Sequence, residues 1–289
     1  MKKIYLVLVI LGLFCSGKCF GEINFKLSCD TVNLKGLIIQ KNISEYIKYD
    51  TIVIPDSLSY NNVLRPVVSV DINSFLNCST LKHIVLPKHL KVINTSAFKN
   101  CKSLKTITLP GSLTTIGQTA FINCTSLDSI IIIPNSVTSL GDSAFKNCSN
   151  LKRVYFPDSL DSISTACFMN CTQLDSVIIP NNTRKVLMSC FENCSSLSYI
   201  KLSDKLQSNL VITFKNTKIR ELIIPTGVKM LFSSAIEGCD SLRYITMQGG
   251  PIICYCSSSF CKNTEETYIN KIINNPNYKN TFIKSRFYP

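Results

Sequence analysis

Cysteine is the residue with the most chemical potential in this chain. The sequence of 289 residues contains 15 cysteines and only two histidines, His83 and His89. In an exported protein, cysteines at this density are typical of a disulfide framework or of a zinc site. Neither histidine has a metal-ligand or catalytic-triad spacing, and the group Cys254, Cys256 and Cys261 has no histidine beside it. We therefore expect no metal site.

The acidic residues offer no catalytic pattern either. Asp56, Asp128, Asp142, Asp158, Asp161 and Asp175 recur outside the apolar segments, where solvated turn positions explain them better than acid–base chemistry. The sequence has no His-Glu-x-x-His, no Gly-x-Ser-x-Gly and no glycine-rich nucleotide motif. We expect a protein that is not an enzyme and that uses no cofactor.

The cysteine spacing instead defines an internal repeat. The pattern Phe-x-Asn-Cys-x-x-Leu-x-x-Ile-x-Leu-Pro begins at Phe75 and returns, with small changes, at Phe98, Phe121, Phe145, Phe168 and Phe191. Most successive cysteines are 23 residues apart, whereas Cys124 and Cys148 are 24 apart, and we place the extra residue in a bulge within residues 130–133. Later copies weaken, since Thr217 replaces the cysteine after Phe214.

Each unit predicts one short strand of alternating apolar residues followed by a turn marked by proline. A second apolar position follows the turn, and the phenylalanine comes five residues later. One unit cannot bury these residues alone, so the units must stack into a solenoid. The segment from Ser57 to Pro66 departs from the repeat, because it lengthens the first interval between proline and phenylalanine.

The units resemble the leucine-rich repeats of BspA-like surface proteins over about residues 47 to 247. The resemblance implies an α/β-type repeat solenoid, a right-handed coil with a parallel β-sheet face and about eight 23-residue repeats. We divide the chain into a signal peptide (1–21), an N-terminal cap with a first half-repeat (22–55), the solenoid (56–247) and a C-terminal cap or tail (248–289). The resemblance also implies adhesion to host extracellular-matrix or cell-surface proteins.

In leucine-rich repeats, the position three residues after the phenylalanine points into the core. We therefore expect a ladder of buried thiols that pack as small hydrophobic groups. Cys167 and Cys190 take a neighbouring small-residue position that other copies fill with alanine, such as Ala97. A disulfide among Cys254, Cys256 and Cys261 is left open. The expected structural core ladder comprises Cys78, Cys101, Cys124, Cys148, Cys171, Cys194 and Cys239.

The N-terminus has the anatomy of a secretory signal peptide. A cationic start, Met1-Lys2-Lys3, precedes an apolar run from Ile4 to Phe14 that is too short to form a typical transmembrane helix. We expect the mature chain to be secreted or held at the cell surface, without a transmembrane segment. The net charge of +13 comes from scattered residues rather than a basic block, so we do not expect nucleic acid as a partner.

Residues that alternate with the core positions of each strand must face outward. Several of these outward residues are aromatic or basic, which favours binding, although tyrosine also has high β-propensity. We predict a protein-binding sheet face, with glycan binding or a purely structural scaffold as alternatives. The predicted ligand-binding residues are Arg153, Tyr155, Tyr199, Lys201 and Tyr244.

Five copies contain Asn-Cys-Ser or Asn-Cys-Thr, which is formally an N-glycosylation sequence. We interpret these asparagines as turn residues of the repeat rather than as modification sites. They are Asn77, Asn123, Asn147, Asn170 and Asn193.

Overall fold

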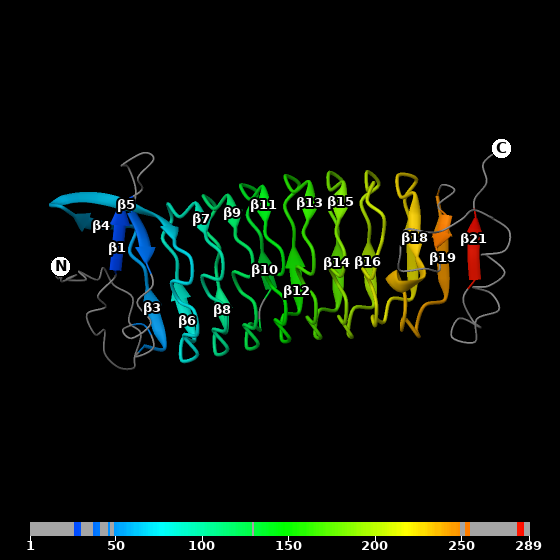
Figure 1. Ribbon diagram of the computed structural model, residues 1–289, viewed down its shortest axis with the longest axis horizontal. Coiled ribbons are helices and arrows are strands. Elements are labelled where there is room, and N and C mark those ends of the chain that lie inside the picture. Colours follow the sequence, from blue (N-terminus) through cyan, green and yellow to red (C-terminus); the bar gives the residue numbers. More distant parts are fainter. Residues whose placement is uncertain are drawn as a thin grey trace.

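The expected solenoid is confirmed by the computed structural model, in which turns of parallel strands stack along one long axis (Figure 1). The structure describes residues 26–29, 37–40, 46, 49–128, 130–248, 252–254 and 282–285. The predicted signal peptide, Cys256 and Cys261 lie outside the described residues, and the side chains of Cys29 and Cys254 are likewise outside them.

The first row of strands forms the sheet face. It consists of three hydrogen-bonded groups that follow one another along the coil. The first group is β3 (Thr51–Val53), β6 (His83–Val85) and β8 (Thr106–Ile107). The second is β10 (Ile130–Ile132), β12 (Arg153–Tyr155), β14 (Ser176–Ile178) and β16 (Tyr199–Lys201). The third is β17 (Glu221–Ile224), β19 (Tyr244–Met247) and β21 (Phe282–Ser285).

In the regular repeats, the second row consists of two-residue strands that follow the proline turns. Its first group is β1 (Lys26–Cys29), β2 (Leu37–Gln40), β5 (Val63–Val70), β7 (Val92–Ile93), β9 (Thr115–Ile116) and β11 (Ser139–Leu140), with β4 (Ser57–Tyr60) paired to β5. Two pairs follow, β13 (Ser162–Ile163) with β15 (Lys185–Val186) and β18 (Met230–Phe232) with β20 (Ile252–Cys254). Parallel pairing therefore continues past residue 247.

Both breaks in the first row coincide with repeats of unusual length. Ile130 pairs with Arg153 and Ile131 with Val154, so the strand keeps the 23-residue register. The extra residue therefore lies between Leu127 and Ile130, ahead of the strand, and the expected bulge within residues 130–133 was wrong. The second break separates β16 from β17, where the step from Ile200 to Leu222 is one residue short (222 − 200 = 22).

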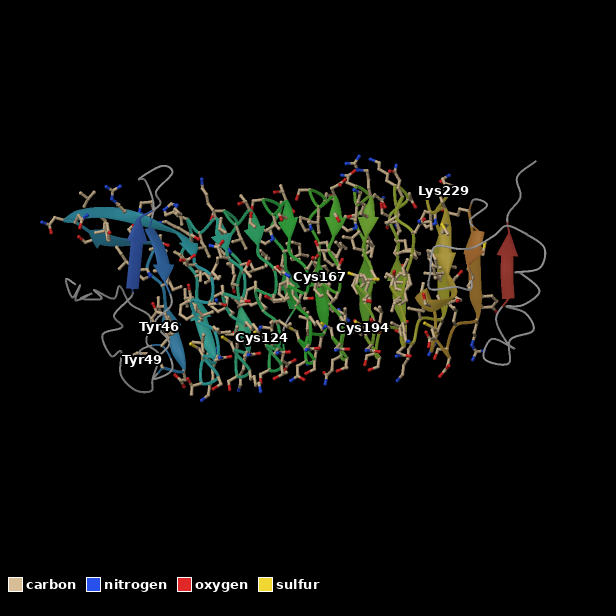
Figure 2. All side chains as sticks on the ribbon, viewed as in Figure 1. Tyr46, Tyr49, Cys124, Cys167, Cys194 and Lys229 are labelled. Atoms are coloured by element: carbon tan, nitrogen blue, oxygen red, sulfur yellow. The ribbon has the colours of Figure 1, made fainter. Side chains whose placement is uncertain are left out.

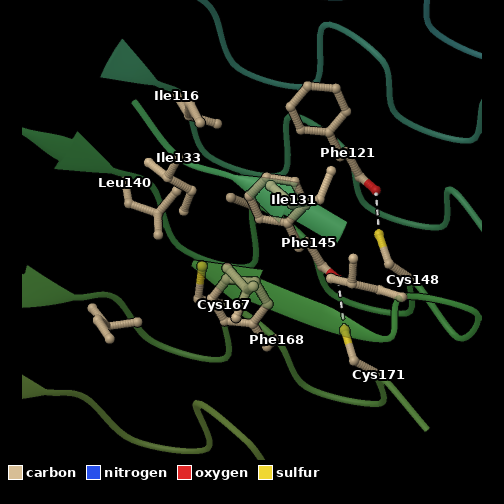
Figure 3. Packing of buried hydrophobic residues seen from close by; sticks show 14 of the residues in the cluster. Ile116, Phe121, Ile131, Ile133, Leu140, Phe145, Cys148, Cys167, Phe168 and Cys171 are labelled. Carbon is tan, nitrogen blue, oxygen red and sulfur yellow. Dashed lines mark hydrogen bonds between the residues drawn. The ribbon is translucent and has the colours of Figure 1, made fainter. Parts of the chain in front are cut away.

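The core is organised around one stack of parallel phenylalanine rings, part of which is drawn in Figure 3. Ring centroids are 5.0 Å apart between Phe75 and Phe98 and widen to 6.4 Å between Phe191 and Phe214. Tyr46, labelled near the N-terminal end of the coil in Figure 2, is the first ring of the stack among the described residues, and its centroid lies 4.7 Å from that of Phe75. The repeat pattern gave no signal for Tyr46, because its own segment does not follow the repeat.

The rest of each turn is built almost without helix. The only helix with described bounds is the 3-10 helix η1 (Ser233–Ala235). Elsewhere, tight turns change the chain direction with recurring positive-φ residues, such as Asn100 (63°) and Ser96 (55°). No helix of the described part is long and apolar enough to cross a membrane.

The irregular segment from Ser57 to Pro66 forms an antiparallel hairpin of β4 and β5. Its two turn residues, Asn61 and Asn62, have φ angles of 51° and 60°, as a two-residue type I′ turn requires. The hairpin accounts for the long first interval between proline and phenylalanine. It projects from the N-terminal end of the coil (Figure 1).

Candidate functional site

The structure places all seven cysteines of the expected core ladder inside the coil, each at most 2% exposed. The nine cysteines with described side chains are free thiols. Most ladder thiols donate to the carbonyl oxygen of the phenylalanine in the preceding turn. Figure 3 shows two of these bonds, from Cys148 to Phe121 and from Cys171 to Phe145, both 3.2 Å long. The thiols thus act as hydrogen-bond donors as well as small apolar groups.

Burial makes these thiols poor nucleophiles. It raises the pKa of Cys148 and of Cys194 to about 12, and that of Cys78 to about 11. Because the thiolate is the reactive form, the ladder cannot supply a nucleophile at neutral pH. Within the described residues, no group of three or more histidine, cysteine or carboxylate side chains could hold a metal ion.

The asparagines before the cysteines form a second ladder. Each Nδ2 donates to Oδ1 of the asparagine in the preceding turn, as Asn147 does to Asn123 and Asn170 does to Asn147, both at 2.6 Å. The ladder residues have φ near 60°, which asparagine tolerates better than most residues. The hydroxyls of the Asn-Cys-Ser/Thr sequences also bond between turns, for example Thr172 to the carbonyl of Ser149.

The sheet face carries exposed apolar side chains over β10, β12, β14 and β16. We call Ile130, Ile132, Tyr155, Ile178 and Tyr199 the sheet-face patch. Their exposed fractions are 49%, 66%, 50%, 58% and 54%. On β8 of the same row, the corresponding outward residue is the polar Thr106. Further exposed apolar residues of the row lie apart from this group: Val85 on β6, Ile223 on β17 and Tyr244 on β19.

The strand register brings most of the predicted binding residues together. Arg153, Ser176 and Tyr199 are aligned on successive strands, and Lys201 is paired with Ile178. Tyr244 lies on β19 in a separate sheet group, two strands beyond β16, at about 10 Å along the row. It is therefore not part of the sheet-face patch.

Two residues of the patch, Ile130 and Ile132, were missed from the sequence. The expected bulge hid their outward direction. Ile131 and Ile133 are buried in the structure. Ile130 and Ile132 alternate with them along the strand, so their side chains point outward.

A groove of about 290 Å³ lies over β12 and β14 within the patch, lined among others by Arg153, Tyr155, Ile178 and Asp158. At one end, Nε of Arg153 is 3.5 Å from Oδ1 of Asp175. A hydrogen bond to Tyr155, together with the charge of Asp175, raises the pKa of Arg153 above its usual value. Arginine is a cation at any physiological pH, and its pair with Asp175 joins two half-exposed side chains.

The comparison with family models identifies the repeat. The model of the BspA type leucine rich repeat region, with six copies, matches residues 68–186 and 162–286, most of the chain. The chain therefore belongs to the BspA-type leucine-rich-repeat family. Leucine-rich-repeat proteins are generally non-enzymatic binding scaffolds, so the family suggests a protein-binding module.

The similarity to a solved structure from Bacteroides ovatus agrees with the fold. A leucine-rich repeat protein from Bacteroides ovatus is 22% identical with a TM-score of 0.57, over 80% of this chain and 71% of that chain. A leucine-rich repeat protein from T. pallidum is 26% identical with a TM-score of 0.48, over 60% of this chain and 87% of that chain. The curated proteins include no significant match.

Proposed function

We propose that this chain is an exported, surface-associated module that binds host or extracellular proteins through the sheet-face patch, and so serves adhesion. The observation that carries the proposal is the group of five large apolar side chains, between 49% and 66% exposed, on four hydrogen-bonded strands. Exposed apolar groups that cluster in this way mark interaction surfaces more often than scattered ones do.

The composition of the patch supports a protein partner. Tyr155 and Tyr199 offer large, rigid contact areas, and the branched Ile132 and Ile178 lie beside them. Tyrosine and arginine are enriched among the residues that dominate binding energy at protein interfaces, and Arg153 stands in the same surface. The backbone beneath is hydrogen-bonded on both sides of β12 and β14, so the patch is preorganised.

Secretion or display at the cell surface belongs to the same proposal. The cationic and apolar N-terminus supports export through a cleaved signal peptide. The measurement is mass spectrometry of the chain recovered outside the cell, where a mature N-terminus near residue 22 is expected. Recovery of the intact chain only inside the cell would contradict export.

The binding proposal is tested by presenting the purified chain to immobilised extracellular-matrix proteins. Replacing Tyr155 or Ile178 with alanine should weaken any specific binding by at least about tenfold, as expected for central anchors. Thr106→Ala on β8 is the matched control, since it lies on the same face outside the patch. Binding that survives both patch substitutions would contradict the proposed site.

Glycan binding is the second candidate, because tyrosines and polar groups meet at one groove. Tyr155 and Tyr199 line it together with Arg153 and Ser176, a combination suited to stacking on a sugar ring while bonding its hydroxyls. A glycan array distinguishes the two functions. Saturable glycan binding that is lost in Tyr155→Ala, without binding to any matrix protein, would favour this candidate.

A further inference from the structure

Phe156 breaks the repeat at the inward position just before the proline turn. The other turns place an aliphatic residue there, and most of these are buried: Leu109, Ile133, Ile179, Leu202 and Ile224. Phe156 is only partly buried, and its ring meets Phe168 edge-on at 5.5 Å and 86°. Leu86 at the same position is also only partly buried, so it is the aromatic ring that distinguishes Phe156. Phe156 lines the groove over β12 and β14.

The groove follows the strand direction. Arg153 begins β12, Tyr155 and Ile178 end β12 and β14, and Asp158 lies in the turn after β12. At about 3.3 Å per residue, the distance along β12 from Arg153 to Tyr155 is about 7 Å, and the turn with Asp158 follows it. This length corresponds to one long side chain rather than to a compact one.

The two charged ends of the groove differ in their partners. Arg153 is engaged by Asp175, whose carboxylate also accepts a 2.7 Å hydrogen bond from Ser176. Asp158 has an exposed side chain, and no ion pair or hydrogen bond joins it to another side chain in the described part of the protein. The uncompensated charge at the groove is therefore the negative charge of Asp158.

We propose that this groove receives a lysine or arginine side chain of the protein partner. Its alkyl stem would lie on Tyr155, Phe156 and Ile178, and its cationic end would reach Asp158. Long basic side chains cover apolar surface with their stems while the charged end stays hydrated, and aromatic faces attract the cation. The inference deepens the proposed function and rests on it, because it names the chemistry of one anchor in the same surface.

Other occupants fit the charges less well. An acidic side chain would need Arg153, which Asp175 already engages, and it would be repelled by Asp158. An apolar side chain would cover Asp158 without giving it a partner, which costs free energy. Lys201, next to Ile178 on β16 but outside the groove lining, opposes a basic occupant. Removal of its charge should therefore strengthen binding slightly.

The experiment is a nuclear magnetic resonance titration of the whole chain, observed at the Ile178 methyl group in the groove. The lysine probe is Nα-acetyl-lysine N-methylamide, which keeps its ε-ammonium group. The other two probes are the corresponding norleucine derivative, which has no ammonium group, and the corresponding glutamate derivative. We expect saturable shifts with the lysine probe and weaker binding of the other two. Asp158→Asn should weaken the lysine probe by about two- to fivefold, the range of an exposed ion pair, and leave the norleucine probe unchanged.

Two further variants sharpen the test. Phe156→Leu restores the residue type of the other turns, so it should fold and should weaken both the lysine and norleucine probes. Asp204→Asn is the matched control, since Asp204 occupies the same place two turns further along and should behave as wild type. Lys201→Gln should strengthen the lysine probe by up to about twofold.

The proposal is overturned if the lysine and norleucine probes bind equally, if the glutamate probe binds best, or if Asp158→Asn has no effect. It is also overturned if the lysine probe causes no saturable shift at Ile178. A matrix protein whose binding is lost in Tyr155→Ala but unchanged in Asp158→Asn and Phe156→Leu would leave the proposed function standing without this anchor. The proposed function itself would be contradicted only if the binding of every partner found were unchanged by substitutions in the sheet-face patch.

Discussion

The two long sides of each turn follow opposite rules. On the side of the ladders, the same residue recurs from turn to turn and contacts its own kind: the buried Phe121 stacks on Phe145, and the partly buried Asn147 donates to Asn123. On the sheet face, the aligned residues change from Ile130 to Arg153, Ser176 and Tyr199. A ladder residue contacts the equivalent residues of both adjacent turns, whereas an outward residue is mainly in contact with solvent. The side of the ladders therefore specifies the fold, and the sheet face can specify a partner.

The ring stack gives the largest expected contrast between the two sides. Phe145→Ala removes a fully buried ring that stacks on both Phe121 and Phe168, so it should lower the free energy of unfolding by about 3–5 kcal/mol. Urea denaturation followed by circular dichroism measures the loss. A cost below about 1 kcal/mol would show that the ring stack does not hold the turns together.

The asparagine ladder should respond next most strongly. Asn147→Gly removes one bond donated to Asn123 and one accepted from Asn170, at a cost of about 1–3 kcal/mol. Asn147→Ala loses the same two bonds and also places alanine at φ 62°, which adds about 1–2 kcal/mol relative to the glycine variant. Thermal unfolding of the two variants separates the hydrogen bonds from the backbone strain. Equal stability of the alanine and glycine variants would contradict the strain.

The thiol ladder predicts instability at high pH. The folded state keeps the Cys148 proton to about pH 12, whereas an unfolded chain loses it near the usual pKa of 9.0. The stabilisation is complete below pH 9 and declines as the pH rises toward 12, by about 1 kcal/mol per pH unit for one such thiol. Cys148→Ala should make the decline between pH 9 and pH 10.5 shallower by that amount. Unfolding in urea at several pH values measures both slopes, and identical slopes would rule out this origin.

Cys148→Ser tests the smaller packing contribution of the same position. The serine hydroxyl is shorter than the thiol and would bond less well to the carbonyl of Phe121, so a loss of about 1–3 kcal/mol is expected at neutral pH. Binding should be retained, because the side chain is fully buried and remote from solvent. Loss of binding in a fully stable variant would contradict the structural role of the ladder.

The repeated residues made much of the fold predictable from sequence. In every regular turn, the repeated phenylalanine, cysteine and leucine have the same environment. The position predicted for one copy therefore holds for the others. Prediction failed where a turn departs from that environment. The extra residue before Ile130 was misplaced because four consecutive isoleucines give no alternation of polar and apolar residues. Tyr46 was missed because its own segment does not follow the repeat.

The candidate site was only partly predictable for a related reason. Alternation assigned Tyr155 and Tyr199 to the outward face, but it could not say which strands hydrogen-bond across the row. The break between β16 and β17 follows from one missing residue, and it separates Tyr244 from the other tyrosines. Phe156 lines the groove, but a pattern that treats phenylalanine and leucine alike as apolar could not single it out.

The sheet face should show the smallest effect on stability and the largest effect on binding. Tyr155 is half exposed and lies outside the ring stack, so Tyr155→Ala should change the free energy of unfolding by at most about 0.5 kcal/mol. The same substitution is expected to weaken partner binding by at least about tenfold, because the ring stands at the centre of the patch. Paired measurements of urea unfolding and of binding to an immobilised partner test this separation. If Tyr155→Ala destabilised the coil as much as Phe145→Ala, the tyrosine would belong to the core, and the division of labour between the two sides would fail.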